Sequence, residues 1–282
     1  MTVHNWFSLA MTSLVALAIV SISSPTVAQT TAQEIAASSL LEDIKRRGEF
    51  RVGLSTWVPW AMRNKKGELI GYEVEVARAV AEDAGWKINL IPTAWDGIIP
   101  ALLSGKFDTI ISGMANTVKR SLTVNFTIPY EYYGTVIVAN KKVAGGKSAL
   151  EDFNEAGILF GGRRGGANLE RNKVLFPKAK WILFDDDPTL IQEILSGRVH
   201  AILGEAPQPG HWASDNPDQL YLPLGNTMIF RGTESFAIRK GDPDFLAFLN
   251  NWIVNRREEG WLKERYDYWF GTRDWADQVP KK

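Results

Sequence analysis

The chain has 282 residues, of which 45% are hydrophobic and 23% are charged. This composition is typical of a folded protein and excludes a disordered chain or a multi-span membrane protein. Its 32 basic residues balance 32 acidic ones, so no basic surface for nucleic acid is expected. The lack of cysteine excludes disulfides, thiolate metal sites and a cysteine nucleophile, and three histidines are too few for most histidine-based metal sites. We therefore expect no metal and no cofactor.

Residues 1–28 are predicted to be a cleaved signal peptide. Residues 7–20 form an apolar run broken only by three Ser or Thr residues, which is short for a membrane span but suits the hydrophobic part of a signal peptide. The small-x-small pattern Thr26-Val27-Ala28 suits cleavage after Ala28. Because no Lys or Arg precedes the apolar run, an uncleaved membrane anchor stays open as an alternative.

The first part of the mature chain alternates predicted helices and strands. Periodic apolar residues and terminating glycines predict, in order, a helix at 40–47, a strand at 50–54, a helix at 71–85, a strand at 88–91, a helix at 95–104 and a strand at 109–112. This alternation favours an α/β lobe with a largely parallel sheet.

The same alternation repeats later in the chain. After a strand at 135–139, the sequence predicts strands at 158–160, 181–184 and 201–204, with helices at 168–175 and 187–196 between them. Asp187 and Pro188 are expected to be the N-cap and the first residue of the latter helix. A strand at 235–238 and helices at 243–259 and 261–269 end the chain. A second α/β lobe is therefore predicted.

Five short motifs occur in a fixed order between Gly71 and Tyr130. They are Gly71-Tyr72-Glu73-Val74-Glu75, Gly97-Ile98-Ile99-Pro100-Ala101-Leu102, Gly105-Lys106-Phe107-Asp108, Thr117-Val118-Lys119-Arg120 and Phe126-Thr127-Ile128-Pro129-Tyr130. Together they resemble the polar-amino-acid family of periplasmic solute-binding proteins of ABC importers, over about residues 40–270. The resemblance implies an α/β, two-lobed periplasmic-binding-protein fold of type II, with two hinge strands and a ligand cleft between the lobes.

The resemblance also divides the chain into lobes. Residues 40–138 and 235–282 would form the first lobe and residues 142–229 the second, so that the C-terminal helices pack back on the first lobe. The hinges are expected near Val138–Lys142 and Ile229–Glu234. In open α/β sheets, ligands bind at the carboxyl ends of the strands, and we expect the cleft there.

The ligand's α-carboxylate is assigned by the resemblance to Arg120. A guanidinium presents paired donors that match a carboxylate, and Thr117 is expected to cap the short helix that carries Arg120. Gly113 stands where the family's backbone approaches the ligand closely, which a residue without Cβ allows.

Three positions depart from the family pattern. Ala115 and Ala167, the latter beside Gly166, stand where the family usually has Ser or Thr, which predicts weaker carboxylate recognition or a changed ligand pose. Glu205 stands where the family has an aspartate that binds the ligand's amine. It keeps the negative charge and can still pair with an ammonium, although a solvent-facing glutamate at a strand end stays open as an alternative.

Tryptophans are expected to line the cleft. Trp57 and Trp95 match aromatic positions of the family and are predicted to stack on the ligand or to face a cation, whereas Trp60 is expected in the core. Arg163 and Arg164 are expected only to flank the cleft turn. These features predict a zwitterion with a flat or apolar side group, because a second carboxylate would find few donors.

The function implied by the resemblance is that of the periplasmic component of an ABC importer. This component would be a monomer that closes on an amino acid or a similar zwitterion and presents it to a membrane permease. A sensory module on the same fold stays open. So does a periplasmic cyclohexadienyl (prephenate/arogenate) dehydratase, which needs a carboxylic acid to protonate a departing hydroxyl. Leu169 occupies the expected acid position, with Glu170 one step on.

Overall fold

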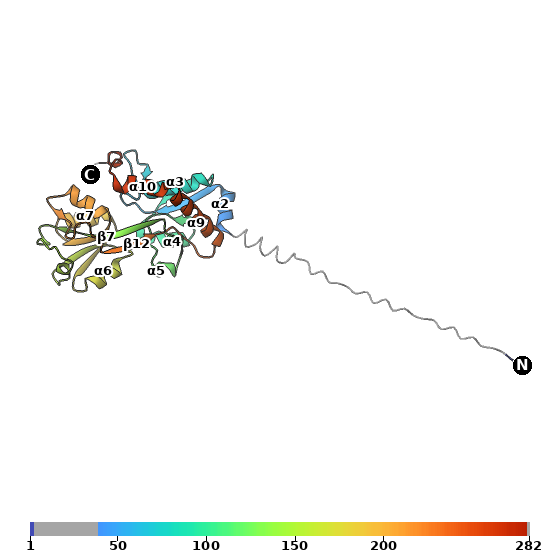
Figure 1. Ribbon diagram of the computed structural model, residues 1–282, viewed down its shortest axis with the longest axis horizontal. Coiled ribbons are helices and arrows are strands. Elements are labelled where there is room, and N and C mark those ends of the chain that lie inside the picture. Colours follow the sequence, from blue (N-terminus) through green and yellow to red (C-terminus); the bar gives the residue numbers. More distant parts are fainter. Residues whose placement is uncertain (3–38, 281–282) are drawn as a thin grey trace. The chain divides into compact units, whose positions relative to one another are not determined.

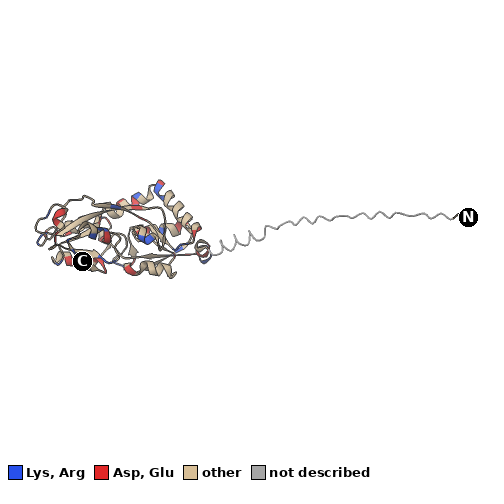
Figure 2. Cartoon of the chain, turned by 90° about the horizontal axis from the view of Figure 1, so that it is seen from below, with Lys and Arg blue, Asp and Glu red and all other residues tan. Residues whose placement is uncertain are grey.

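The computed structural model describes residues 1–2 and 39–280. The predicted signal peptide, apart from its first two residues, and its cleavage site lie outside the described residues. From residue 39 the chain forms two α/β lobes, each built around one main sheet (Figure 1). Basic and acidic residues are interspersed over the described chain (Figure 2). Within the described residues, no helix has both the length and the apolar character needed to cross a bilayer.

The sheet of the first lobe has the strand order β4-β1-β5-β13-β6. Strand β1 (Glu49–Leu54) runs parallel to β4 (Lys87–Pro92) and to β5 (Thr109–Ile110). Strand β13 (Ala237–Ile238) runs antiparallel to β5 and to β6 (Asn125–Phe126). A small hairpin of β2 (Met62–Arg63) and β3 (Leu69–Ile70) stands beside it. The expected parallel arrangement is therefore confirmed for the strands at the start of the lobe.

The sheet of the second lobe has the order β11-β7-β10-β8-β9. Strand β8 (Leu159–Arg163) is parallel to β9 (Lys180–Phe184) and β10 (Ala201–Glu205). The long strand β7 (Glu131–Asn140) is antiparallel to β10 and to β11 (Leu220–Tyr221). Strands β8 and β10 therefore end at the same edge of the sheet, where a site is expected.

The helices largely follow the predicted segments. The described helices longer than three residues are α2 (Leu40–Arg47), α3 (Tyr72–Asp83), α4 (Ile98–Leu103), α5 (Val118–Ser121), α6 (Leu169–Leu175), α7 (Asp187–Leu195), α8 (Gln208–Asp215), α9 (Pro243–Glu258) and α10 (Trp261–Tyr266), followed by a π-helical turn (Asp267–Gly271). Short 3-10 turns occur at Trp95–Gly97, Glu151–Phe153 and Ala276–Gln278. Helix α8 was not expected, because Pro209 and Gly210 in its first turn are common in loops, although proline is tolerated at that position.

The C-terminal helices pack on the first lobe, as expected. Phe245, Leu249 and Trp252 of α9 share one buried cluster with Phe50 of β1 and Tyr72 of α3. Fully burying side chains of this size stabilises the fold by roughly 1.5–3 kcal/mol each. The second lobe has its own buried clusters on the two faces of its sheet. Each lobe therefore has a packed core of its own.

The two lobes are joined by a pair of strands that differs in part from the expected hinges. Strand β12 (Phe230–Glu234) coincides with the second expected hinge and pairs antiparallel with residues 131–135 of β7. The first hinge was expected at Val138–Lys142, but residues 135–139 of β7 pair with β10 inside the second sheet. That prediction was wrong because the unbroken strand β7 both crosses between the lobes and continues into the second sheet. No turn residue therefore marks the place where the chain crosses. The lobe boundaries drawn at that hinge stay a prediction.

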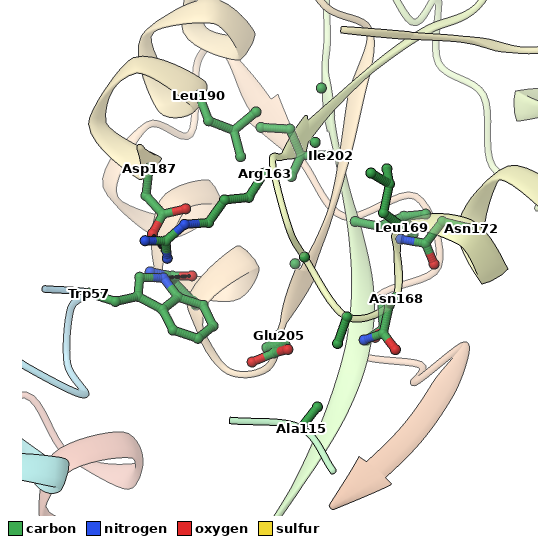
Figure 3. A pocket seen from close by; sticks show the side chains of 18 of the residues that line it. Trp57, Ala115, Arg163, Asn168, Leu169, Asn172, Asp187, Leu190, Ile202 and Glu205 are labelled. Atoms are coloured by element: carbon green, nitrogen blue, oxygen red, sulfur yellow. Dashed lines mark hydrogen bonds and ion pairs between the residues drawn. The ribbon is translucent and has the colours of Figure 1, made fainter. Parts of the chain in front are cut away.

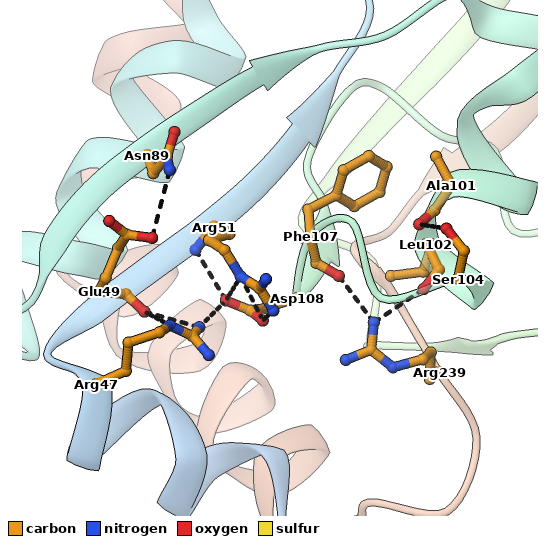
Figure 4. Close-up of polar contacts among 10 residues, drawn as sticks. All are labelled: Arg47, Glu49, Arg51, Asn89, Ala101, Leu102, Ser104, Phe107, Asp108 and Arg239. Carbon is orange, nitrogen blue, oxygen red and sulfur yellow. Dashed lines mark hydrogen bonds and ion pairs between the residues drawn. The ribbon is translucent and has the colours of Figure 1, made fainter.

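One sequence motif has a structural role away from the cleft. Asp108 of the Gly-Lys-Phe-Asp motif is fully buried and accepts hydrogen bonds from the Arg47 and Arg51 guanidinium groups (Figure 4). The hydrogen bonds that Arg51 donates to Asp108 raise the pKa of Arg51. Arg239 donates to the Leu102 and Phe107 carbonyl oxygens, at 2.8 Å each. These charges tie α2, β1 and the turn before β5 together.

Candidate functional site

Residues of both lobes line one pocket where β8 and β10 end (Figure 3). All eight residues singled out in the sequence lie along it, namely Trp57, Trp95, Gly113, Ala115, Arg120, Gly166, Ala167 and Glu205. The other lining residues were not predicted from the sequence to bind a ligand, among them Thr135, Arg163, Asn168, Asn172, Trp181, Asp187, Gln208 and Trp212. That the eight residues bind a ligand stays a prediction.

Arg120 reaches from the first lobe to the second. The hydroxyl of Thr117 caps its helix by accepting the Arg120 N–H at 3.2 Å, as predicted. The guanidinium donates to the Ala115 carbonyl at 2.9 Å and to the Gly165 carbonyl of the other lobe at 3.0 Å. Its carbon lies 5.4 Å from the centre of the Trp95 ring, and burial lowers the pKa of Arg120. Because a guanidinium has five N–H donors, further donors remain for a ligand.

Gly113 has a structural role that the sequence did not reveal. Its φ of 58° lies in the left-handed region, and a Cβ there would come within 2.8 Å of the Trp60 ring. Its N–H donates to the Tyr130 hydroxyl at 3.2 Å, inside the first lobe. The glycine therefore lines the pocket while its N–H donates inside the first lobe, and its close approach to a ligand stays a prediction.

Ala115 presents backbone rather than side-chain groups to the site. It forms an isolated bridge with Glu234 at the end of β12, through Asn116 N–H to the Thr233 carbonyl and Ser235 N–H to the Met114 carbonyl. Its own carbonyl accepts from Arg120. The methyl side chain adds no donor, as expected from the sequence.

The turn after β8 forms the opposite rim of the pocket. Gly165 has a φ of 73°, and the Gly166 N–H closes the turn on the Arg163 carbonyl at 3.1 Å. The Trp95 indole N–H donates to the Gly165 carbonyl at 3.2 Å. Trp95 therefore bridges the lobes as well as lining the pocket, and Ala167 follows the turn as a lining residue.

Trp57 and Trp60 form a stacked pair with separate roles. Their ring centres are 3.9 Å apart with planes 5° from parallel. Trp60 is 3% exposed and belongs to the core, which confirms that prediction. Trp57 is half-buried, lines the pocket and donates its indole N–H to the Gln208 side-chain oxygen at 2.9 Å. One face of Trp57 is thus covered by Trp60.

Glu205 is the carboxyl group of the pocket with the least satisfied environment. It is the last residue of β10, and Figure 3 shows it between Trp57 and Ala115. Its Oε2 atom is buried and has no hydrogen-bond partner among the described residues. Burial raises the pKa of Glu205 to about 8, while Arg120 opposes the shift. A buried carboxyl group in this state is a favourable partner for a cation.

Arg163 lies in the pocket, which corrects the expectation for the Arg163-Arg164 pair. Its guanidinium donates to Asp187 Oδ2 at 3.0 Å and to the Ser55 hydroxyl of the other lobe at 3.2 Å. Arg164 is exposed and pairs with Asp185. Because side chains alternate between faces along a strand, adjacent arginines at a strand end point in opposite directions. That alternation is the feature of the sequence that could have distinguished Arg163 from Arg164.

The start of α7 also differs from the prediction. The N-cap is Asp186, whose carboxylate accepts the Thr189 N–H at 2.7 Å and whose pKa is lowered by that hydrogen bond. Asp187 is the first helical residue, and its carboxylate pairs with Arg163 instead. The reason is the run of three aspartates, within which the sequence does not fix the capping residue.

Gln208 joins the lobes directly. It is 4% exposed, and besides accepting from Trp57 it donates to the Val58 carbonyl at 2.8 Å. At the edge of the same interface, Arg273 forms a two-pronged ion pair with Asp215 of α8, at 2.5 and 3.1 Å. The lobes therefore meet through their own side chains around the pocket.

Glu170, one residue past the acid position expected of a dehydratase, lies outside the lining of the pocket. The Glu170 side chain is 76% exposed and faces Lys173 along α6. Leu169, at the expected acid position itself, lines the pocket. Within residues 39–280, no group of three or more His, Asp or Glu is placed to hold a metal ion.

A second group of buried carboxyls lies in the first lobe, away from the lining of the pocket. The Tyr130 hydroxyl donates to Glu73 Oε1 at 2.5 Å, and burial raises the pKa of Glu73 to about 8. Glu234 is 1% exposed, and burial together with Glu205 and Glu73 raises its pKa well above the usual range. The Tyr72 hydroxyl donates to Glu131, whose pKa burial also raises. We call Glu73, Glu131 and Glu234 the hinge carboxyls.

Comparison with known proteins places the chain in a family. Residues 50–272 match the bacterial extracellular solute-binding proteins, family 3. The chain belongs to this family, which confirms the resemblance seen in the motifs.

Relatives within and beyond transport share the fold. The L-cystine-binding protein TcyJ of Escherichia coli is 28% identical over 87% of this chain and 91% of its own length. The cyclohexadienyl dehydratase of Pseudomonas aeruginosa is 23% identical over 84% and 88%. The crystal structure of the ancestral amino acid-binding protein AncCDT-1, a precursor of cyclohexadienyl dehydratase, superposes with a TM-score of 0.74 at 33% identity, covering 83% of this chain and all of that one. The chain thus has the type II periplasmic-binding-protein fold.

Proposed function

We propose that this protein binds an amino acid, or a similar zwitterion, between its lobes as the periplasmic component of an ABC importer. The observation that carries the proposal is the placement of Arg120 and Glu205 along one pocket, where one lobe supplies a guanidinium and the other a carboxyl group. A zwitterion is the ligand class whose two charges such a pair complements. The names of the relatives, which include an L-cystine-binding and an amino acid-binding protein, support this class.

Arg120 is the proposed partner of the ligand's carboxylate. Its guanidinium is held by the Ala115 and Gly165 carbonyls and by the Trp95 ring, so little side-chain freedom remains to be lost on binding. An ion pair formed with a guanidinium held in place adds direction as well as energy.

Glu205 is the proposed partner of the ligand's ammonium. Burial raises the pKa of Glu205, so its carboxyl group holds a proton to a higher pH than usual. An ammonium beside Oε2 would lower this pKa, because it favours the carboxylate. Ligand binding should therefore release a proton near neutral pH.

Closure of the lobes on the ligand would complete the site, because Arg120 comes from one lobe and Glu205 from the other. The closed form is the one that we propose is presented to a membrane permease. A signal peptide at residues 1–28, a periplasmic location and a monomeric state complete the proposal.

The test is a calorimetric and thermal-shift screen of the twenty amino acids on the mature protein. At least one should bind, and Arg120→Ala should weaken its binding about 30-fold or more, the effect of leaving a buried charge unpaired. Lys119→Ala is the matched control, since Lys119 is exposed on the same helix. Equal affinities of Arg120→Ala and the wild type would remove Arg120 from the site.

A dehydratase is the second candidate function. The observation that favours it is Glu205, a pocket carboxyl whose raised pKa suits a general acid. Glu170, next to the acid position expected from the sequence, is exposed outside the pocket. Prephenate and arogenate should show no turnover above background if the binding function is right. Turnover that is lost in Glu205→Gln and kept in Glu170→Gln would establish the enzyme instead.

A further inference from the structure

Four buried side-chain polar atoms of pocket residues have no hydrogen-bond partner among the described residues. They are Arg163 Nε, Asn172 Oδ1, Trp181 Nε1 and Glu205 Oε2. Buried polar atoms in folded proteins are almost always hydrogen-bonded, because leaving one unpaired costs about 1–3 kcal/mol. Five further atoms of this kind lie elsewhere in the described residues, but these four belong to residues that line one pocket, where a polar ligand can supply the partner.

Arg163 is the charged donor in this set. Its guanidinium is held by Asp187 on one side and by Ser55 of the other lobe on a second side. Its carbon lies 5.4 Å from the centre of the Trp95 ring, the same distance as that of Arg120. In Figure 3 the side chain extends from β8 toward Asp187 and Trp57. The two arginines therefore face one indole from different lobes.

We propose that Arg163 selects the ligand's side chain by binding an oxygen acceptor at its end, a carboxylate or a carboxamide. The proposal rests on the proposed function, in which Arg120 holds the α-carboxylate and Glu205 the α-ammonium. In that arrangement the ligand's α-carboxylate and α-ammonium do not contact Arg163, so the Arg163 cation is left for the ligand's side chain.

The placement of Arg163 supports contact with the same ligand. Arg120 and Arg163 both act on the carboxyl of Glu205, and both lie beside Trp95. A ligand that touches Arg120 and Glu205 is therefore within a side chain's length of Arg163. Its buried Nε–H has no acceptor among the described residues, while its two Nη groups donate to Asp187 and Ser55.

The charge of Arg163 predicts which ligand side chains should bind best. A cationic side chain would meet the Arg163 guanidinium, and a hydrocarbon side chain would leave the Nε–H without an acceptor. The sequence-based preference for apolar side groups over aspartate and glutamate assumed that few donors were available. Arg163 supplies the missing donor, and Asp187 beside it moderates the charge, so both the carboxamide and the carboxylate are accommodated.

The experiment compares four ligands of similar length on the mature protein by calorimetry: L-glutamine, L-glutamate, L-norleucine and L-lysine. Wild type should bind glutamine or glutamate about tenfold or more tightly than norleucine and lysine. Arg163→Met should remove this preference, while its affinity for norleucine changes by less than about threefold. The matched control is Arg164→Met, at the neighbouring exposed arginine, which should leave all four affinities unchanged.

Arg163→Lys is the second variant, used alone if Arg163→Met does not fold. It keeps the charge but loses the Nε–H, and it should reduce the glutamine-to-norleucine ratio. An unchanged ratio in Arg163→Lys or Arg163→Met would overturn the proposal. So would a wild type that prefers lysine or norleucine, or an equal loss for all ligands, which would mean that Arg163 only holds the lobes together.

The proposed function can fail separately. If no amino acid of the full screen binds to the wild type, the proposed function fails and the role of Arg163 fails with it. If norleucine or lysine binds best and Arg120→Ala abolishes that binding, the function stands and only the role of Arg163 is wrong.

Discussion

The pocket and the hinge carboxyls bury acidic groups in similar ways but differ in access. Burial raises the pKa of Glu205 and of Glu73 to about 8 in each case. Glu73 is fully buried, and the Tyr130 hydroxyl occupies one of its oxygens, whereas Glu205 is half-buried on the wall of a pocket. A shifted pKa alone therefore does not locate a binding site. Access to the pocket, and not the pKa, separates a carboxyl group that a ligand can contact from one that can affect stability alone.

The largest expected difference between the two regions is in ligand affinity. Glu205→Gln removes the charge that faces the ammonium and should weaken amino-acid binding about 100-fold. Glu73→Gln should leave affinity within about threefold, because its carboxyl group is sealed from the pocket. Titration calorimetry of both variants against the best ligand of the screen measures the contrast. Equal losses in the two variants would show that the hinge carboxyls act on binding.

A substitution at Gly113 should damage the packing between the two regions. Gly113→Ala places a Cβ within 2.8 Å of the Trp60 ring and 3.5 Å from Glu234 Oε1, at a φ of 58°. We expect a loss of about 2 kcal/mol in the free energy of unfolding, from strain and overpacking together. Gly145→Ala is the control, because its φ of 64° is similar and its Cβ would meet nothing within 4 Å. Urea unfolding should show a clearly larger loss for Gly113→Ala, and equal losses would mean that Trp60 moves aside freely.

Affinity should depend on pH through Glu205. The free protein holds a proton on Glu205 up to about pH 8, and a bound ammonium favours release of that proton. Binding should therefore strengthen about tenfold between pH 6 and pH 8 and then level off. Calorimetry in buffers of different ionisation enthalpy would detect the released proton. A flat profile in the wild type, or an identical slope in Glu205→Gln, would contradict the assignment.

The smallest expected effect is on thermal stability and belongs to the sealed region. The pKa of Glu73 is about 8 in the folded protein and near 4.3 in an unfolded chain, so the folded state holds more protons between these values. The stability linked to Glu73 is therefore present at low pH and is lost as pH rises toward 8. Glu73→Gln should remove this dependence and raise Tm at pH 8 by about 2–4 °C. An unchanged Tm across pH 5–8 in the wild type would show that Glu73 does not titrate as described.

Much of the fold could be predicted because its elements follow simple periodicity. Helix α2 ends at Gly48 as its pattern indicates, and β1, β4 and α3 match their predicted positions within one or two residues. Helix α8 was missed because its first residues have the composition of a loop. The crossing within β7 was misplaced because pairing partners, and not local residues, decide where a strand changes lobes.

Site residues that belong to sequence motifs could be predicted. Site residues that only tertiary structure brings together were missed. Arg120, Trp95 and Glu205 were found by their place in a family pattern. Arg163 was missed because it stands next to a second arginine and a glycine turn, and only the pleat of β8 distinguishes the two. Gln208 has no signal in the sequence, since its role depends on meeting Trp57, 151 positions away along the chain.

The hydrogen bonds of Gln208 to Trp57 and Val58 can change the affinity for every ligand without changing which ligand is preferred. Both contacts join the lobes in the described structure, and neither involves a solute. Their free energy is therefore common to all ligands and cancels from any ratio of affinities. Evolution can change residues at this contact to match a scarce or an abundant nutrient without altering which nutrient is chosen. Affinities of a ligand series measured on Gln208→Ala should accordingly shift in parallel.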